Sequence, residues 1–384
     1  MMPTQEERLA EAIRAVDFAA IVLSDPDDVC YATGFEVPPP VDAGAAFAYG
    51  PTLAVATQAG SVLVAPVAYE LRANELSRAD TTLLVPGLGQ LEPVDGQAEL
   101  LASIRMALNE LGVRDGMTIG VDEATLPAEL HSYLGSLLPA SDMKDARPVV
   151  RSARMIKTEH EIELLRGAAA AADAGHEALL ALAAPGRNEL EVMGDVLTAV
   201  NRTAGRPLPW VGELVTGPRT GVLRYPGGPV DRELAQGDTV LMDLSVRDLG
   251  YWADCTNTLA VGREPTHRQL RYFRAAQDAY DAAVTELRPG RLASMAHAAA
   301  SEALRKHGFE PAHYTGHQVG ASVNEAPRLV PYDQTPIEVG MVFAVEPGCY
   351  GGLEIGTGAR TERVVHVTDD GAAPLTCFPW GMQG

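Results

Sequence analysis

Two aspartates occur in a pair of strand-like segments that are otherwise rich in apolar residues. Along DTVLMDLSV (238–246), one face of an extended strand carries only apolar residues, and Asp243 lies on the other face. A tight turn follows, and the chain returns as YWADCTNTLAV with Asp254 inside it. If the hairpin is centred on Asp248–Leu249, the two aspartates face each other directly. Carboxylates placed in this way repel each other unless a cation or a shared proton lies between them.

A second pair of acids occurs near the end of the sequence. Glu346 finishes the apolar segment FAVEPG, and Glu362 lies inside the next strand-like segment, ARTERVV. The Gly-rich connection at 348–358 does not fix the register, so it remains open whether these glutamates also oppose each other. Two acid pairs in apolar strands are hard to explain as solvated surface.

One imidazole completes the candidate metal-binding set. His313 and His317 are four residues apart in HYTGHQVG, but Gly316 and Gly320 argue against a helix that would direct both toward one metal. A structural role for a lone histidine stays open, and the G-H-x-x-G setting makes His317 the stronger ligand candidate. Four carboxylates and one imidazole suit two divalent ions, such as Mn²⁺, Co²⁺, Fe²⁺ or Zn²⁺. Two ions about 3.5–4 Å apart can activate a water and polarise a substrate carbonyl.

The elements before residue 145 alternate short apolar segments with amphipathic ones. Strands are predicted at 19–24, 52–56, 61–65, 81–85 and 117–121. Helices are predicted at 4–16, 67–78 and 97–111. This alternation predicts an α/β domain at residues 1–148.

The segment DARPVVRSARMIK (145–157) marks the junction to a second domain. After it, Thr158 and Glu161 predict the capping box of a long helix. Further helices are predicted at 188–204, 266–287 and 292–307. Strand-like segments lie between and after them: DTVLMDLSV, YWADCTNTLAV, GMVFAVEPG and ARTERVVHV. Residues 152–384 are therefore predicted to form an α+β domain of helices packed on a largely antiparallel sheet.

The composition limits the classes of function. A chain of 384 residues suits two domains, and no apolar run approaches the roughly 20 residues that cross a bilayer. A formal net charge of −21 argues against a nucleic-acid partner. The four cysteines form no C-x-x-C pair, so neither a zinc knuckle nor a disulfide framework is predicted. The acidic, amphipathic start differs from a secretion signal, and a cytoplasmic enzyme without a membrane partner is expected.

These residues and their order resemble the pita-bread metallopeptidase family, which includes methionine aminopeptidase, prolidase and Xaa-Pro aminopeptidase, with creatinase as a non-peptidase relative. FAAIVLSDPDDVCYATGF resembles the start of the creatinase-type N-terminal domain, and RSARMIKTEHEIELLRGAA resembles the first helix of the catalytic domain. Four segments match the family's metal motifs in order and spacing: LMDLSVRDLGYWADCTNTLAVG, YTGHQVGASVNEAPRL, GMVFAVEPGCY and GARTERVV. The resemblance covers nearly the whole chain and implies a pita-bread fold for the second domain.

The resemblance also implies a role for each ligand. Asp243 is implied to hold one ion, while His317 and Glu346 hold the other. Asp254 and Glu362 are implied to bridge the two ions. Glu346 is further implied to carry a proton from the attacking water to the leaving amine, as a general base and then a general acid.

Two positions depart from the pattern of the family's peptidases. Arg224 replaces a histidine upstream of the first aspartate, and Asn324 replaces the histidine of an H-E-x-P motif. Arg224 cannot transfer a proton near neutral pH, but it could bind a substrate carboxylate or pair with a nearby acid. Asn324 could donate a hydrogen bond to an oxyanion or act structurally, and both residues join the predicted catalytic set of Glu346 and His317.

Two further residues are candidates for substrate binding. Arg360 matches an arginine two residues before the last ligand, for which the resemblance implies a structural or substrate-orienting role. His313, the histidine that is not predicted to bind metal, is the other candidate.

Three functions are compatible with these residues. The complete ligand set favours a dinuclear peptidase that acts at Xaa-Pro bonds, like aminopeptidase P or prolidase. The two lost histidines motivate an alternative, a hydrolase or lyase of a small carboxylated metabolite on the same fold. A non-catalytic scaffold is disfavoured, because all five ligands are kept. The resemblance also implies a homodimer, often with the partner's N-terminal domain lining the site.

Overall fold

The computed structural model describes residues 3–39, 44–87, 92–223 and 227–382. It divides into two compact units, Met1–Arg154 and Met155–Gly384. The division lies slightly C-terminal of the predicted boundary at 148–152. The reason is that RPVVRSAR forms helix α6 (Arg147–Arg154), which packs against α1 (Gln5–Ala15). Much of the segment that the sequence marks as a junction therefore belongs to the first unit.

The first unit is built on a mixed β-sheet. Its strands are β1 (Ala20–Leu23), β2 (Leu53–Ala56), β3 (Ser61–Pro66), β4 (Thr81–Val85), β5 (Ile119–Val121) and β6 (Met143–Asp145). Within the described residues they form one sheet in the order β4-β3-β2-β1-β5-β6. β2 runs antiparallel to β1 and β3, and the other neighbours are parallel. The predicted strands are confirmed, whereas β6 was not predicted because its partly exposed MKD sequence lacks an apolar pattern.

Helices pack on this sheet and complete its core. They are α2 (Pro26–Thr33), α3 (Glu70–Leu76), α4 (Gly96–Glu110) and α5 (Ala128–Leu137), with 3₁₀ turns η1 (Ala45–Phe47) and η2 (Val67–Tyr69). The predicted helices are confirmed as α1, α3 and α4. α2 was not predicted because it is short, although the N-cap Asp25 and the left-handed Gly34 mark its two ends. Leu100, Ile104 and Leu108 of α4 pack into the core.

The second unit contains antiparallel strands that belong to separate sheets. They are β7 (Trp210–Thr216), β8 (Thr239–Asp248), β9 (Tyr251–Ala260), β10 (Gly316–Gln318), β11 (Glu325–Leu329), β12 (Val342–Val345), β13 (Gly348–Tyr350), β14 (Gly358–Arg360), β15 (Arg363–Thr368) and β16 (Gly371–Pro374). In the described part of the chain, the sheet orders are β7-β8-β9, β11-β10-β12-β15-β16 and β13-β14. All these pairs are antiparallel, as predicted, but they do not form a single sheet.

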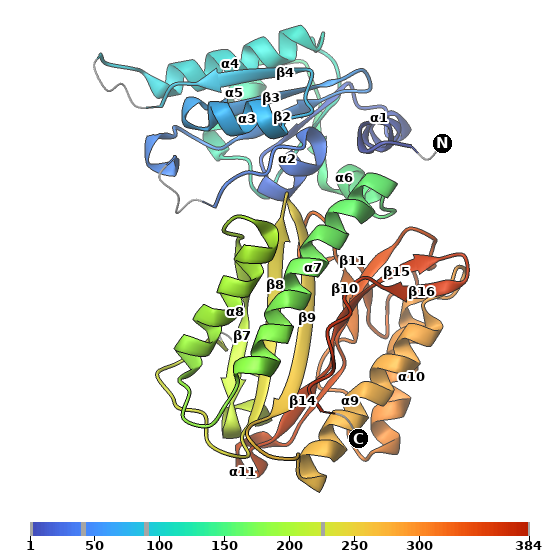
Figure 1. Ribbon diagram of the computed structural model, residues 1–384. Coiled ribbons are helices and arrows are strands. Elements are labelled where there is room, and N and C mark those ends of the chain that lie inside the picture. The colour runs from blue at the N-terminus through green and yellow to red at the C-terminus, as the bar shows by residue number, and fades with distance from the viewer. Residues whose placement is uncertain (1–2, 40–43, 88–91, 224–226, 383–384) are drawn as a thin grey trace. The chain divides into compact units, whose positions relative to one another are not determined.

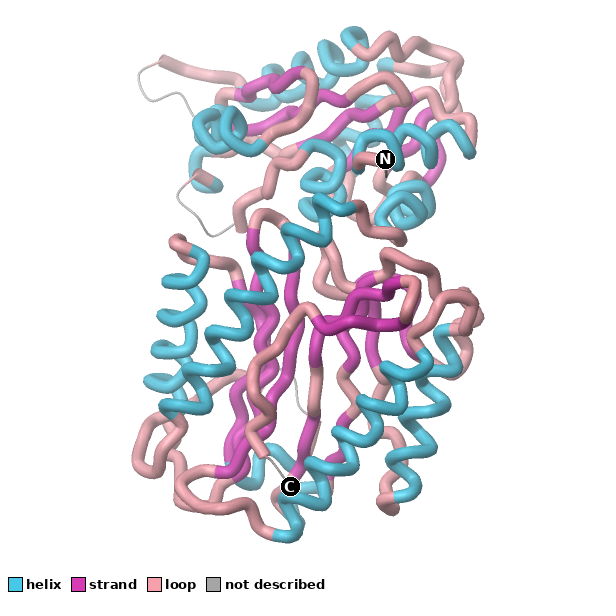
Figure 2. Tube along the Cα trace, turned by 45° about the vertical axis from the view of Figure 1, so that its right-hand side comes forward, coloured by secondary structure: helices cyan, strands magenta, loops and turns pink. Residues whose placement is uncertain are grey.

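Two pairs of long helices flank these strands. The helices are α7 (Glu159–Leu182), α8 (Glu189–Ala204), α9 (His267–Glu286) and α10 (Ala293–Lys306), with the short α11 (Gly352–Ile355) and η3 (Gly217–Gly221). Thr158 and Glu161 form the predicted capping box of α7. α7 packs along β8 and β9 with α8 at its side (Figure 1). Figure 2 shows the strands of this unit gathered between the α7–α8 pair and the α9–α10 pair. No helix in the described residues combines the length and apolar character that a bilayer crossing needs.

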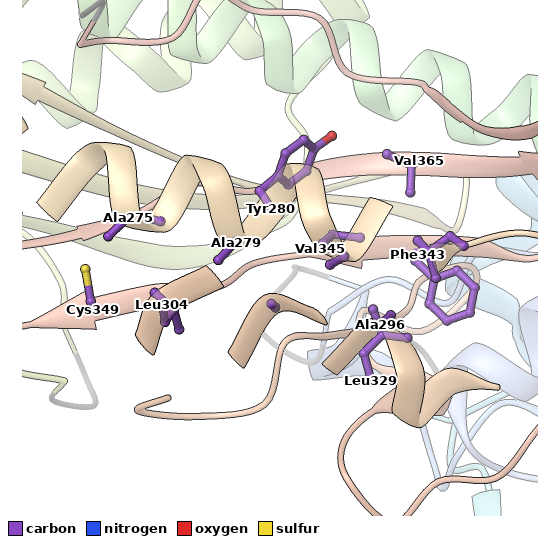
Figure 3. Packing of buried hydrophobic residues seen from close by; sticks show 14 of the residues in the cluster. Ala275, Ala279, Tyr280, Ala296, Leu304, Leu329, Phe343, Val345, Cys349 and Val365 are labelled. Carbon is purple, nitrogen blue, oxygen red and sulfur yellow. The ribbon is translucent and has the colours of Figure 1, made fainter. Parts of the chain in front are cut away.

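One buried apolar cluster of the second unit lies between α9, α10 and the strands β12 and β15. Ala275 and Ala279 of α9 and Leu304 of α10 belong to the same buried cluster as Phe343 and Val345 of β12 (Figure 3). Small alanine side chains allow the helices to approach the strands closely at native packing density. This core fixes β12, the strand that precedes one of the predicted metal ligands.

A pair of glycine substitutions tests how tightly α7 packs. A Cβ atom at Gly175 would lie 2.7 Å from Leu244 Cδ2 and 2.9 Å from Val200 Cγ2, whereas a Cβ at Gly194 of α8 meets nothing. We expect Gly175→Ala to destabilise the second unit by about 1–3 kcal/mol through overpacking. The matched control Gly194→Ala is expected to stabilise it by about 0.5–1 kcal/mol through helix propensity.

The measurement is urea unfolding followed by tryptophan fluorescence, because all three tryptophans lie in the second unit. Equal unfolding free energies for the two variants would contradict the close packing of α7 on β8.

Candidate metal centre

The hairpin of β8 and β9 carries Asp243 and Asp254 in a register that differs from the prediction. Asp243 lies opposite Thr256, and Asp254 lies opposite Ser245. The turn is centred one residue later than predicted, on Leu249–Gly250, where both residues have positive φ (48° and 85°) as a type I′ turn requires. The predicted direct opposition of the two aspartates is therefore wrong. Moving the centre of the turn by one residue changes the cross-strand partner of each residue by two positions. Side chains alternate between the two faces of a strand, so both carboxylates still lie on one face of the hairpin, as diagonal neighbours.

Glu346 and Glu362 lie opposite each other between two short ladders. β12 pairs with β15, and β13 pairs with β14, in one continuous register that sets Glu346 against Glu362. The backbone N–H of Glu362 donates to the Thr256 carbonyl at 3.0 Å, and the Thr256 hydroxyl donates to Glu362 Oε2 at 2.6 Å. Because Thr256 is also the cross-strand partner of Asp243, these bonds bring the second acid pair against the first.

His317 is held by a strand and points its Nε2 atom at the acids. It lies in the middle of β10, between β11 and β12, and is 2% exposed. Its Nδ1–H donates to the Gln318 carbonyl at 2.9 Å, which leaves the Nε2 lone pair for a ligand. Nε2 lies 3.2 Å from Glu346 Oε1 and 3.6 Å from Asp254 Oδ2. The glycine-rich segment around this histidine thus forms a strand rather than a helix.

Three of the predicted ligands have the spacing of a metal site. Asp254, His317 and Glu362 each present a buried ligand atom, and these atoms lie within 4.8 Å of one another. Oδ1 of Asp243 is also buried and has no hydrogen-bond partner among the described residues. Carboxylate oxygens and one imidazole nitrogen form a donor set for divalent cations. With Glu346 beside His317, the residues present fit the metal ions that the sequence predicts.

Arg360 is the buried cation of this cluster. Its Nη2 lies 2.5 Å from Asp243 Oδ2 and 3.4 Å from Glu213 Oε2. Its Nε donates to the Thr256 hydroxyl at 2.9 Å, and its Nη1 donates to the Tyr350 hydroxyl at 3.5 Å. At 1% exposure, the guanidinium is surrounded by these partners. Of the two roles implied for Arg360, these contacts support the structural one.

Burial dominates the electrostatics of the cluster. It raises the pKa of Asp243 and of Glu362 well above the usual carboxyl range, and the charges of neighbouring acids raise both further. Burial acts in the same direction on Glu346, but the hydrogen bond and charge of His317 outweigh it and lower the pKa of this glutamate. Burial lowers the pKa of His317, but its bond to Glu346 and the nearby carboxylates raise it overall. Without metal, protons therefore occupy acids that a divalent cation would use.

Two family descriptions match the chain and together span most of it. Residues 163–369 match metallopeptidase family M24, and residues 6–156 match the creatinase/prolidase N-terminal domain. The first match alone covers more than half of the chain. The chain belongs to metallopeptidase family M24. The predicted family, the predicted fold of an α/β domain followed by a pita-bread domain, and the predicted metallohydrolase activity are thereby confirmed.

Curated relatives and a solved structure agree with this assignment. A probable dipeptidase of Mycobacterium tuberculosis, PepE, is 33% identical over 321 residues, which are 78% of this chain and 84% of the relative. A Xaa-Pro dipeptidase of Pyrococcus furiosus is 30% identical over 261 residues, which are 67% of this chain and 73% of the relative. The crystal structure of dipeptidase PepE from Mycobacterium ulcerans matches with a TM-score of 0.76 at 27% identity, over 99% of this chain and 96% of that chain.

The predicted substrate-binding residues of this M24 chain have different surroundings. Arg224 lies outside the described residues. Asn324 precedes β11, and its Oδ1 accepts a hydrogen bond from Arg328 Nε at 3.0 Å. His313 donates through Nδ1 to the carbonyl of the next residue at 2.7 Å and accepts through Nε2 from the Tyr350 hydroxyl at 3.3 Å. His313 is thus linked through Tyr350 to the buried arginine of the metal centre, and the substrate roles of these residues stay predictions.

The sequence reasoning missed three residues of the M24 centre. Glu213 lies on β7 directly opposite Asp243, and it is the only charged residue of the strand sequence WVGELVT, the same signal that identified the other acids. Thr256 also lies opposite Asp243, on the other side, so the correct hairpin register would have identified it. Tyr350 lies in the Gly-rich connection, where no periodic pattern marks it.

The raised pKa values of Asp243 and Glu362 predict that metal stabilises the protein more as the pH rises. Below these pKa values the acids hold protons that compete with the cation. As the pH rises through them, the metal-free fold loses stability because the folded state favours the protonated acids. We expect the rise in Tm on saturation with Mn²⁺ to be larger at about pH 8 than at about pH 5.

Differential scanning calorimetry of chelator-treated protein, with and without Mn²⁺, provides the measurement. K⁺ at equal ionic strength is the control and should leave Tm unchanged at both pH values. The same Mn²⁺-dependent rise in Tm at both pH values would contradict proton competition at these acids.

Proposed function

We propose that this chain is a dinuclear metal-dependent peptidase that cleaves Xaa-Pro bonds, in the manner of an aminopeptidase P or a prolidase. The observation that carries the proposal is the convergence of Asp254, His317 and Glu362, with Glu346 3.2 Å from the imidazole. Relatives named Xaa-Pro dipeptidase and probable dipeptidase support a peptide substrate. These names favour a peptide over the small carboxylated metabolite that the sequence left open as the alternative.

Two divalent ions are part of the proposal. Asp243 would hold one ion, and His317 and Glu346 would hold the other, with Asp254 and Glu362 shared between them. The donor set suits Mn²⁺, Co²⁺, Fe²⁺ or Zn²⁺. When bound, the ions supply a Lewis acid that polarises the scissile carbonyl and activates the attacking water.

Glu346 is the proposed proton carrier. As an ionised carboxylate beside the attacking water, Glu346 would accept a proton from it. The protonated carboxyl can then donate to the amine that leaves when the peptide bond breaks. Asn324 could orient the substrate through an amide hydrogen bond, because it occupies the position of the family's substrate-contacting histidine.

A homodimer in the cytoplasm completes the proposal. None of the four cysteines forms a disulfide in the described residues, which suits a reducing compartment. Light scattering of the purified protein should give a mass about twice that of the 40.7 kDa chain. A mass equal to one chain would remove the dimer from the proposal without affecting the metal centre.

A panel of peptides tests the activity. We expect Xaa-Pro dipeptides and Xaa-Pro-Xaa tripeptides to be cleaved in the presence of Mn²⁺ or Co²⁺, with matched Xaa-Ala peptides as controls. Preference for the dipeptides would indicate a dipeptidase, and preference for the tripeptides an aminopeptidase. Glu346→Gln should reduce kcat by about 10²–10⁴-fold, because it removes the proton carrier. The metal content of this variant is measured in parallel, since Glu346 is also a proposed ligand.

Failure of the metal-loaded protein to cleave any Xaa-Pro peptide would overturn the peptidase proposal. Cleavage that persists undiminished in Glu346→Gln with its metal content intact would overturn the proposed role of this residue alone.

Arg224 is proposed to bind the free carboxylate of a dipeptide substrate. A charge-assisted hydrogen bond is worth about 1.5–3 kcal/mol, so Arg224→Ala should raise KM for a Xaa-Pro dipeptide by about 10–100-fold. The same dipeptide with an amidated C-terminus is the matched control, and its KM should change little. An equal increase in KM for both substrates would show that Arg224 does not recognise the carboxylate.

A further inference from the structure

The hydrogen atoms of the Arg360 guanidinium are distributed over specific partners. Nε binds the Thr256 hydroxyl, and Nη1 binds the Tyr350 hydroxyl. Nη2 carries two hydrogens and has two carboxylates beside it, Asp243 at 2.5 Å and Glu213 at 3.4 Å. The two hydroxyls therefore fix the orientation of the guanidinium. Its Nη2 amino group lies between two carboxylates, those of Asp243 and Glu213.

Glu213 is placed to share this arginine with Asp243. It lies on β7 directly opposite Asp243 on β8, and it is 6% exposed. Its Oε1 is buried without a hydrogen-bond partner among the described residues, as is Oδ1 of Asp243. Two acids on neighbouring strands, Glu213 buried and Asp243 partly buried, thus each offer one oxygen to Arg360, and the second oxygen of each accepts no hydrogen bond from the described residues. Glu213 is not among the residues that the sequence predicts to bind metal.

The charges explain why a second acid is needed. A buried guanidinium is costly unless a carboxylate balances it. If Asp243 were the only partner of Arg360, its charge would be engaged by the arginine, and a cation would have to compete for it. With Glu213 present, the arginine has its own counter-charge. Asp243 can then turn its oxygens to a cation without leaving Arg360 unbalanced.

We propose that Glu213 is a positioning residue that balances Arg360 and thereby frees Asp243 to bind the metal ion on its side of the centre. The inference rests on the dinuclear site of the proposed function. Glu213 acts through Arg360 and not as a ligand, so it should affect mainly the ion on the Asp243 side. The ion held by His317 and Glu346 is linked to Arg360 less directly, through Thr256 and the shared ligand Glu362.

The test is the titration of chelator-treated full-length protein with Co²⁺, followed by isothermal titration calorimetry and by the absorption of bound Co²⁺. We expect Glu213→Gln to weaken the binding of one of the two ions by about 10–100-fold, the usual effect of losing a residue that supports a ligand, and to weaken the binding of the other ion much less. Glu213→Asp keeps the charge at a longer distance and should weaken the same ion by a smaller factor.

Glu191→Gln is the matched control, because it removes a carboxylate from an exposed surface ion pair with Arg187 in the same unit. It should leave both affinities unchanged. The double variant Glu213→Gln, Arg360→Gln should bind the weakened ion more tightly than Glu213→Gln alone, because the unbalanced arginine is gone. A purely structural role for Glu213 would not produce this recovery.

The outcomes separate the inference from the proposed function. A wild-type protein that binds fewer than two ions would overturn the dinuclear proposal itself. If the wild type binds two ions, unchanged affinities in folded Glu213→Gln, or equal weakening of both ions, would overturn the role of Glu213. If Glu213→Gln fails to fold, Glu213→Asp decides, and unchanged affinity for both ions in that variant would overturn the inference.

Discussion

The mutual repulsion of buried carboxylates is the constraint on which the second unit of this protein depends. Asp243, Asp254, Glu346 and Glu362 are brought together from separate segments of the chain, and their removal from water raises the pKa of Asp243 and Glu362. Such an arrangement needs protons or cations for balance. His317 and Arg360 supply part of the positive charge, and divalent ions would supply the rest. Holding these acids together therefore lowers the stability of the metal-free fold, and the site is complete only with metal.

Polar side chains behind the acids determine where each carboxylate points. The hydroxyl of Ser245 donates to Asp254 at 2.6 Å, and Thr256 bridges Glu362 and Arg360. Because hydroxyls both donate and accept, they can orient a carboxylate without adding charge. Ligands supported in this way lose less freedom when they bind a cation, which is the usual purpose of contacts around a metal site.

Asp243, Asp254 and His317 lie within strands, and Glu346 and Glu362 lie in the two-residue gaps between consecutive strands. The helix pairs hold these strands. β8 and β9 lie against α7, while β12 lies in the core formed with α9 and α10. The backbone bond from Glu362 to Thr256 connects strands of different sheets at the centre. These strands therefore define the spacing of the ligands, and Tyr350 joins the centre from the last position of β13.

The sequence by itself determined the kinds of ligand, most of the helices and strands, and the capping box at Thr158. These depend on side-chain chemistry and on patterns within a few residues, which the order of amino acids records directly. Only the tertiary structure decided that Asp243 faces Thr256, that Arg360 holds Asp243, and that Glu213 joins them. The hairpin register depends on one turn in which Leu249 adopts a positive φ, a conformation that its sequence does not favour. The contacts of Arg360 and Glu213 join residues more than a hundred positions apart, and no local pattern encodes their distance.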